Sequence, residues 1–218
     1  MKEKKEEQLE EQESLSEVVE DMQEVVTAAE RGFVSGLGAF FIEVLKILFL
    51  AVITIVIVRY FLFKPFYVKG ASMEPTYYAS EYLIVDELTY RFRTPERGEV
   101  VVFEAPIAEK DFYIKRVIAL PGERVKVAQG KVVIYNEAHP QGFVLDETYI
   151  VEETPGSDTL TVAEGEYYVL GDNRNASLDS RTFGAISENL IVGRAWLRGW
   201  PFTRLGIIHS PTYTIEKS

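Results

Sequence analysis

One long apolar run stands out near the start of the chain. Residues 44–63 carry only two charges, Lys46 and Arg59, and both lie near the ends of the run. Twenty helical residues at about 1.5 Å each span the roughly 30 Å hydrocarbon core of a bilayer. A buried helix of a soluble protein rarely runs this long without a polar face, and a cleavable signal peptide does not end in bulky residues such as 60–63. The sequence predicts a transmembrane anchor over residues 43–64.

The residues before this anchor, 1–42, form an acidic segment. The first thirteen are rich in glutamate, which favours a solvated chain. Ser14 and Glu17 have the spacing of a capping box. The apolar residues that follow recur at the three- and four-residue steps of an amphipathic helix: Leu15, Val18, Met22, Val25 and Ala29. Two heptads are too few for a coiled coil, so a short helix beside the membrane is preferred over a partner-binding zipper.

Residues 65–218 show short apolar or alternating runs broken by turn residues. Residues 128–131, Ala-Gln-Gly-Lys, connect two of these runs as a hairpin. Strand–helix–strand alternation is missing, which argues against a parallel sheet. The predicted fold class is mainly β, a mostly antiparallel β catalytic domain behind one transmembrane helix. The predicted strands are Tyr82–Val85, Val100–Phe103, Tyr113–Leu120, Val125–Val127, Val132–Tyr135, Thr148–Val151, Tyr167–Leu170 and Leu190–Trp196.

Composition and charge exclude several classes of function. The chain has a formal net charge of −11, and residues 1–31 alone supply −7 of it, so no basic surplus can neutralise nucleic-acid phosphates. The chain has no cysteine, which excludes disulfides, thiolate catalysis and cysteine-bound metals. The two histidines, His139 and His209, lie outside any His-Glu-x-x-His pattern, so a zinc protease has no ligand set. We predict no metal and no other cofactor.

A candidate nucleophile follows the anchor almost at once. Ser72 comes after two small residues, Gly70 and Ala71, which let another backbone approach closely, and Pro75 ends the local strand. Such a turn leaves a serine hydroxyl exposed beside free backbone amides. The alternative is an ordinary loop, and this segment alone does not decide between the two.

A serine nucleophile needs a base, and neither histidine lies in a suitable pattern. Lysine is the other base known for serine nucleophiles. On a strand, Lys115 shares one face with Tyr113, Val117 and Ala119, whereas Arg116 points to the other face. An ammonium group on an apolar face is desolvated, and desolvation lowers its pKa. The alternative is an edge-strand lysine that discourages aggregation.

A third segment, residues 171–181, is dense in acids, arginines, serines and asparagines. It follows a predicted strand and precedes Thr182-Phe183-Gly184. This composition indicates either a hydrogen-bonded loop packed near a site or a turn-rich surface loop.

Together, the three segments resemble the bacterial type I signal peptidases. The resemblance covers most of the chain, from the anchor to about Gly206, and includes Arg97–Phe103, Pro121-Gly122-Glu123, Val192–Ala195 and Trp200-Pro201-Phe202. It implies a membrane-bound serine endopeptidase with a Ser-Lys dyad that removes signal peptides from exported preproteins. It also implies a cytoplasmic N-terminus and an extracytoplasmic catalytic domain, an orientation that the flanking charges do not decide. The implied partners are secretory preproteins with small residues at −1 and −3, the lipid bilayer and the protein export machinery.

The resemblance assigns roles position by position. Ser72 matches the acylated nucleophile, Lys115 its general base, and Ser177 the serine whose hydroxyl orients that lysine. Three further residues match the groups that brace the loop: Asp172, a structural carboxylate, and the ion pair of Asp179 with Arg181. The small substrate pockets correspond to Phe66, Val68, Met73, Tyr77, Tyr113 and Ile114.

Three positions depart from the family pattern. Gly70 stands where some members have a serine hydroxyl as the second oxyanion donor, so this donor is not assigned. Asn175-Ala176 replaces the more usual Asp-Asn in the polar loop, and Tyr77 replaces a frequent leucine, which affects the depth of the pocket.

Two other functions are compatible with parts of the sequence. A self-cleaving repressor of the SOS type uses the same dyad, but it needs a DNA-binding domain where this chain has an anchor. A membrane-tethered β module that binds a partner without catalysis leaves the match of three polar segments to one protease unexplained. Cleavage of a secretory preprotein discriminates between these readings.

Overall fold

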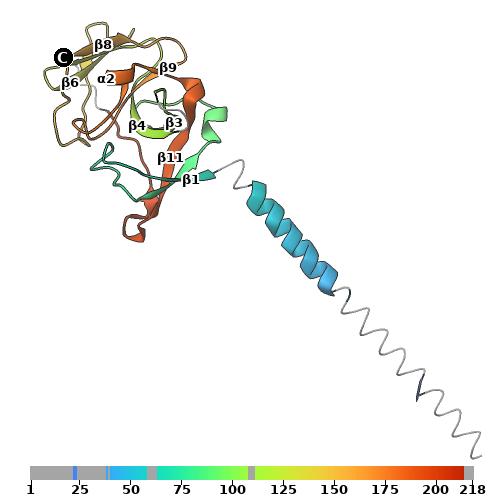
Figure 1. Ribbon diagram of the computed structural model, residues 1–218. Helices are drawn as coiled ribbons and strands as arrows, with labels where there is room; N and C mark the ends of the chain where they lie inside the picture. The colour runs from blue at the N-terminus through green and yellow to red at the C-terminus, as the bar shows by residue number, and fades with distance from the viewer. Residues whose placement is uncertain (1–21, 24–37, 39, 58–62, 108–110, 214–218) are drawn as a thin grey trace, which may run out of the picture. The chain divides into compact units, whose positions relative to one another are not determined.

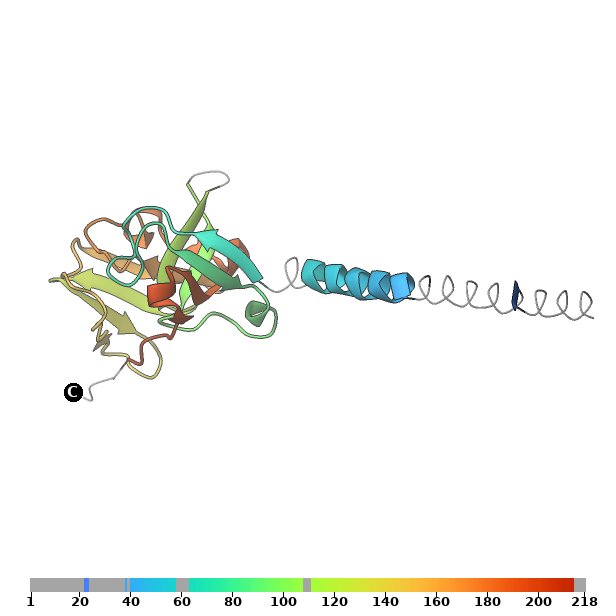
Figure 2. The ribbon, with the colours of Figure 1, turned by 90° about the horizontal axis from the view of Figure 1, so that it is seen from below.

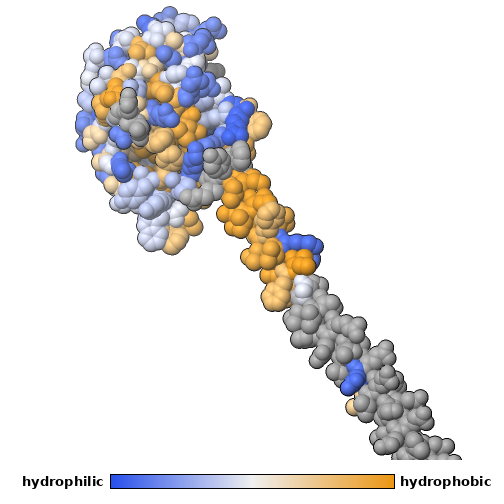
Figure 3. All heavy atoms as spheres, turned by 45° about the vertical axis from the view of Figure 1, so that its right-hand side comes forward, coloured by the Kyte–Doolittle hydropathy of each residue, from blue (hydrophilic) through white to orange (hydrophobic). Residues whose placement is uncertain are grey.

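The computed structural model describes residues 22–23, 38, 40–57, 63–107 and 111–213. The chain divides into two compact units, residues 1–56 and 57–218. Of the described helices, Phe40–Ile57 is long and apolar enough to cross a membrane (Figure 3).

The predicted anchor agrees with this helix over residues 43–57. Residues 58–62 lie outside the described part, and Phe63 and Lys64 already belong to the first strand. The predicted amphipathic helix also lies outside the described residues, except for positions 22 and 23, which are helical.

The second unit consists of two antiparallel sheets (Figures 1 and 2). The larger sheet has the strand order β1-β2-β11-β3-β4-β9-β10, and β12 pairs with β11. Its strands are β1 (Phe63–Tyr67), β2 (Tyr82–Asp86), β3 (Val100–Glu104), β4 (Phe112–Ala119), β9 (Glu166–Leu170), β10 (Ile186–Ser187), β11 (Ile191–Trp200) and β12 (Gly206–Ile207). The smaller sheet has the order β7-β6-β5-β8 and consists of β5 (Arg124–Ala128), β6 (Lys131–Tyr135), β7 (Phe143–Val144) and β8 (Asp158–Thr161).

Four short helical segments complete this unit. They are the α-helix α2 (Ser180–Phe183) and the 3-10 helices η1 (Thr89–Arg91), η2 (Glu188–Leu190) and η3 (Phe202–Arg204). Asp179 caps α2, because its side chain accepts a hydrogen bond from the amide of Arg181.

The predicted fold class is confirmed, because every strand pair among the described residues is antiparallel. The predicted hairpin joins β5 to β6, and its two turn residues, Gln129 and Gly130, have positive φ angles of 53° and 77°. The predicted strand Thr148–Val151 is wrong. This segment is a turn closed by a hydrogen bond from Ile150 N to Glu147 O, and its Val151 side chain is 80% exposed.

The centre of the core is β4, which pairs with β3 and β9. Val117 on one face packs with residues of β3 and β9, whereas Ile118 and Ala119 pack with apolar residues of the smaller sheet. A fully buried valine or isoleucine side chain stabilises the fold by about 1.5–3 kcal/mol. The smaller sheet therefore covers the second half of β4, and the first half, residues 112–115, extends toward the site described next.

Candidate active site

Ser72 lies in a tight turn that begins after Gly70, a few residues beyond the end of β1. The turn is closed by hydrogen bonds from Glu74 N to Ala71 O and from Tyr77 N to Met73 O, at 3.1 and 2.8 Å. Gly70, with a φ of 77°, adopts the left-handed conformation that suits glycine. The two small residues therefore allow the chain to leave the strand and present the Ser72 side chain to a cavity.

Lys115 reaches this serine from an interior strand. Its Nζ atom lies 2.8 Å from Ser72 Oγ and 2.9 Å from the carbonyl oxygen of Ile114, both within hydrogen-bond distance. The residue is 3% exposed. Since its side chain is buried and bonded to Ser72 rather than exposed to solvent, the interpretation of Lys115 as an edge-strand lysine that discourages aggregation does not apply.

The surroundings of Lys115 favour its neutral form. Burial lowers the pKa of the amine from 10.5 to about 8, and the carboxylates of Asp179 and Asp172 oppose this shift only in part. The ring of Tyr113, on the same face of β4, has its centroid 5.4 Å from Nζ. The predicted shared face of Tyr113 and Lys115 is therefore present, and desolvation is the cause of the lowered pKa.

A polar loop, residues 171–179, contacts the backbone of Ser72. The amide of Asn173 donates a hydrogen bond to the carbonyl oxygen of Ser72 at 3.0 Å. A Cβ atom added to Gly171 would clash with the Ser72 carbonyl oxygen and with Ser177 Oγ. Glycine at this position therefore allows the loop to pack directly on the serine.

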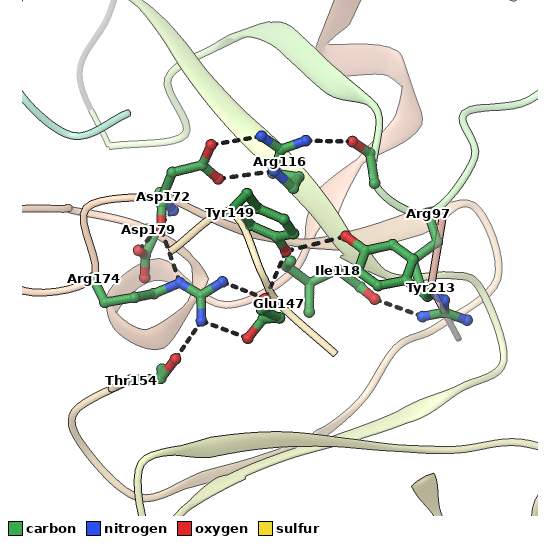
Figure 4. Close-up of polar contacts among 12 residues, drawn as sticks. Arg97, Arg116, Ile118, Glu147, Tyr149, Thr154, Asp172, Arg174, Asp179 and Tyr213 are labelled. Carbon is green, nitrogen blue, oxygen red and sulfur yellow. Dashed lines mark hydrogen bonds and ion pairs between the residues drawn. The ribbon is translucent and has the colours of Figure 1, made fainter. Parts of the chain in front are cut away.

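Two ion pairs brace this loop, and both involve residues assigned from the sequence. Arg116 donates two hydrogen bonds to the buried carboxylate of Asp172, at 2.8 and 2.6 Å (Figure 4). Arg181 donates two to Asp179, at 2.8 and 2.7 Å. Asp179 also accepts a hydrogen bond from the amide of Gly171 at 3.1 Å, so its carboxylate ties both ends of the loop together.

The structure differs from the sequence-based expectation at Ser177. Its hydroxyl oxygen is buried beside Gly171 and has no hydrogen-bond partner among the described residues. Lys115 hydrogen-bonds to the Ile114 carbonyl oxygen instead of to Ser177. The expected hydrogen bond that would orient the lysine is therefore not made in this structure.

A cavity of about 450 Å³ opens beside Ser72 and Lys115. Of the six residues predicted for the pockets, four line it: Phe66, Val68, Tyr113 and Ile114. Met73 and Tyr77 do not line it, because both are buried in the core cluster that lies against Val68 and Ile114. The remaining lining residues were not predicted, and they include Tyr67, Lys69, Leu83, Val102, Asp111, Phe112, Ala176 and Leu178.

The walls of this cavity offer two unpaired strand edges. β1 is the terminal strand of the larger sheet, and β9 pairs with β4 only from Arg116 onward, so residues 112–115 have no partner on that side. The rings of Phe66 and Phe112 lie 5.4 Å apart, although three strands separate β1 from β4 in the sheet. The sheet therefore curves, and the arrangement can take an extended peptide between β1 and β4 by strand addition.

The histidines lie elsewhere. His139 packs against Phe143 in the smaller sheet, with ring centroids 5.0 Å apart, and His209 is exposed near the C-terminus. Neither histidine lines the cavity. In the part of the chain that the structure describes, no group of three His, Cys, Asp or Glu side chains could hold a metal ion.

Comparisons with known proteins identify the family of the chain. The profile of the family described as "Signal peptidase, peptidase S26" matches residues 41–200. The chain is 40% identical over 174 residues to the probable signal peptidase I-2 of Synechocystis sp., covering 77% of this chain and 77% of that protein. It is 36% identical over 177 residues to signal peptidase IB of Staphylococcus aureus, covering 75% and 92%. A crystal structure of a signal peptidase I from Enterococcus faecalis is 32% identical, with a TM-score of 0.41, and covers 47% of this chain and 97% of that chain.

Proposed function

Since the chain belongs to the signal peptidase family, peptidase S26, we propose that it is a membrane-bound serine endopeptidase that removes signal peptides from exported preproteins. The observation that carries this proposal is the hydrogen-bonded pair of Ser72 and Lys115, both of which line the cavity of about 450 Å³. A buried amine with a lowered pKa next to a serine hydroxyl is the arrangement that a Ser-Lys dyad requires.

In the proposed reaction Ser72 is the nucleophile and Lys115 the general base. The neutral amine takes the proton of Ser72 Oγ while that oxygen attacks the carbonyl carbon of the scissile bond. The tetrahedral intermediate then collapses, Lys115 donates the proton to the leaving amine, and an ester on Ser72 remains. Lys115 next takes a proton from a water molecule that attacks this ester, which releases the signal peptide and restores the serine.

The negative charge of the intermediate needs a hydrogen-bond donor. We assign this role to the backbone amide of Ser72, which belongs to the turn that begins after Gly70. Gly70 has no side chain to add a second donor, and we assign none. Asp172, Asp179 and Arg181 act by holding the loop around the serine.

The cavity supports a preference for small residues at the −1 and −3 positions of the substrate. The side chains of Val68, Tyr113 and Ile114 line the cavity together with the dyad. We infer that these bulky side chains limit the substrate side chains there to little more than methyl groups. An extended substrate that pairs with β1 and β4 places alternate side chains on the same side, so the −1 and −3 residues enter the cavity together.

The domain organisation follows from the same proposal. Residues 1–42 form an acidic cytoplasmic tail, and the single-pass anchor in the cell membrane begins at residue 43 and ends before β1. The extracytoplasmic catalytic domain begins with β1 at Phe63. This orientation places the cavity on the side where preproteins leave the membrane and where contact with the export machinery is possible. The helix Phe40–Ile57 supports the anchor by its length and composition.

The test is cleavage of a secretory preprotein by the purified chain in detergent, followed by sequencing of the product's N-terminus. The expected result is a single cut after the signal peptide, which is lost in Ser72→Ala. If the wild-type chain binds the preprotein and leaves it intact, the non-catalytic binding module is the better description.

A further inference from the structure

A second buried arginine belongs to the loop that holds Ser72. Arg174 is 2% exposed, and its Nε atom donates a hydrogen bond to the carbonyl oxygen of Gly171 at 2.9 Å. Its remaining guanidinium nitrogens bind the carboxylate of Glu147 through two hydrogen bonds, one of them at 2.8 Å, and also the hydroxyl of Thr154 (Figure 4). A guanidinium group with this many charge-assisted hydrogen bonds is rigidly placed.

Both partners of this arginine come from outside the larger sheet. Glu147 and Thr154 lie in the connection between β7 and β8 of the smaller sheet, residues 145–157. Tyr149 in the same connection donates a hydrogen bond to Glu147 at 2.7 Å, and its ring lies 4.1 Å from the guanidinium carbon of Arg116. Figure 4 shows these side chains converging on the two arginines from this connection. The smaller sheet therefore contacts the polar loop at its charged residues.

The contact between the smaller sheet and the polar loop affects Asn173, the residue whose amide binds Ser72. Asn173, whose amide holds the Ser72 carbonyl oxygen, stands between Asp172 and Arg174 in the chain. Asp172 is fixed by Arg116 on β4, and Arg174 is fixed by Glu147. Displacement of reacting atoms by about 1 Å can slow a reaction by about 100-fold. The position of Ser72 relative to Lys115 thus depends on both anchors.

We propose that Glu147 is a positioning residue of the peptidase, which acts through Arg174 and Asn173 to keep Ser72 within reach of Lys115. This inference rests on the proposed function and gives the smaller sheet a role in the reaction. Glu147 is not among the residues that line the substrate cavity. Its loss is therefore expected to lower kcat and to leave KM nearly unchanged.

The experiment compares two charge-removing variants in the full chain. Glu147→Gln keeps the shape of the side chain but weakens the pair with Arg174. Glu123→Gln is the matched control, because Glu123 is similarly buried and binds Arg97 at 2.6 Å, Asn136 and the amide of Leu120 without contacting the polar loop. We expect Glu147→Gln to lower kcat at least tenfold with KM within threefold of wild type, and Glu123→Gln to keep both constants within threefold.

The outcomes separate this proposal from a merely structural role. Thermal unfolding is measured for both variants, and kinetics are compared well below each Tm. A Glu147→Gln variant with wild-type kcat, or an equal fall of kcat in Glu123→Gln, overturns the proposal. If Glu147→Gln fails to fold, the double variant Glu147→Met/Arg174→Met removes both charges and leaves no buried charge unpaired. A folded double variant with wild-type kcat overturns the proposal as well.

The wild-type reaction distinguishes this proposal from the one on which it rests. If the wild-type chain does not cut the preprotein, the proposed function is wrong and the positioning role falls with it. If the wild type cuts and Glu147→Gln cuts equally well, the positioning role alone is wrong.

Discussion

Lys115 and Arg116 are neighbours on β4, and they serve the site from opposite faces of the sheet. The Lys115 amine lies 2.8 Å from Ser72 Oγ, whereas the Arg116 guanidinium group pairs with Asp172, in the loop behind the serine, at 2.6 Å. Two adjacent residues on one strand therefore hold the Ser72 hydroxyl and the loop that supports it. Both side chains keep their relative position because β4 is an interior strand.

Replacing the base tests the dyad directly. Lys115→Arg keeps the positive charge but cannot act as a base, because a guanidinium group does not lose its proton in proteins. We expect kcat/KM for preprotein cleavage to fall by about 10²–10⁴-fold, the usual contribution of a general base. Lys115→His is expected to be equally inactive, since the shorter ring does not reach Ser72. Near-normal cleavage by Lys115→Arg would contradict the assignment.

The pH dependence of wild-type cleavage reports the same lysine. Since burial lowers the pKa of Lys115 to about 8, the neutral amine and with it kcat/KM should rise with pH and level off above about 8. His139→Ala and His209→Ala are the controls, because neither histidine lines the cavity. Loss of the rising limb in either histidine variant would show that another group is the base.

The free energy of unfolding should also depend on pH because of this buried lysine. The unfolded chain keeps the ordinary pKa of 10.5, so between pH 8 and 10.5 it binds more protons than the folded chain, and stability rises with pH. Below pH 8 the lysine is buried in its charged form, and this burial lowers the free energy of unfolding by about 3 kcal/mol. Lys115→Met should therefore be more stable than wild type near pH 7, and this gain should shrink as the pH approaches about 10. Urea unfolding of wild type and Lys115→Met at about pH 7 and about pH 10 measures this gain in stability. A gain that is independent of pH would refute burial of a charged lysine as its cause.

Glycine at position 171 is expected to be essential for activity. A Cβ atom there would clash with the Ser72 carbonyl oxygen and with Ser177, so Gly171→Ala should move the loop away from the serine and lower kcat by at least about tenfold. Gly206→Ala is the matched control, because a Cβ at that position has nothing within 4 Å. Equal activity of the two variants would show that the close approach is not required.

Substrate preference should follow the shape of the cavity. A preprotein with alanine at −1 and −3 is expected to be cut. Phenylalanine at −1 should lower kcat/KM by about 100-fold, because we infer that Val68, Tyr113 and Ile114, which line the cavity, exclude a ring. Lysine at −1 should be rejected as well, since its charge would be buried without a partner. Competition between matched preproteins measures the ratios, and equal cleavage of the phenylalanine substrate would disprove the preference.

The β-rich unit should fold without the helix Phe40–Ile57. Its three apolar clusters are formed entirely by residues from Val68 onward, so the fragment 64–218 contains the whole described core of this unit. We expect a single cooperative urea transition and measurable cleavage of a preprotein. A gradual, non-cooperative transition would place the domain boundary elsewhere.

The strands could be predicted from the sequence wherever an alternating apolar run reflects burial on one face, as in β5 and β6, or a continuous apolar run reflects burial on both faces, as in β3 and β9. This holds for β2 to β6, for β9 and for β11. It fails at residues 148–151, where Tyr149 is turned toward Glu147 and Arg116 by polar and aromatic contacts that no periodicity encodes. β7 and β12 are two-residue strands, too short to give a pattern.

The candidate site was predictable to a different extent at each residue. The apolar neighbours of Lys115 on its strand predict that its amine is desolvated. Its contact with Ser72, 43 positions away in the chain, was expected only from the family resemblance. Met73 and Tyr77 were assigned to the pocket from the family resemblance, whereas the turn directs both into the core. The pair of Arg174 with Glu147 had no local signal, because it depends on how the two sheets pack.

The hydrogen bonds of Glu147 and Thr154 to the guanidinium group of Arg174 also affect how the chain can change in length during evolution. Both residues must reach Arg174 at the same time, so an insertion or deletion between them would release one of them. The tip between β6 and β7, residues 137–141, is mostly exposed and far less constrained. Length variation among descendants of this protein should therefore accumulate at that tip and be purged between positions 147 and 154.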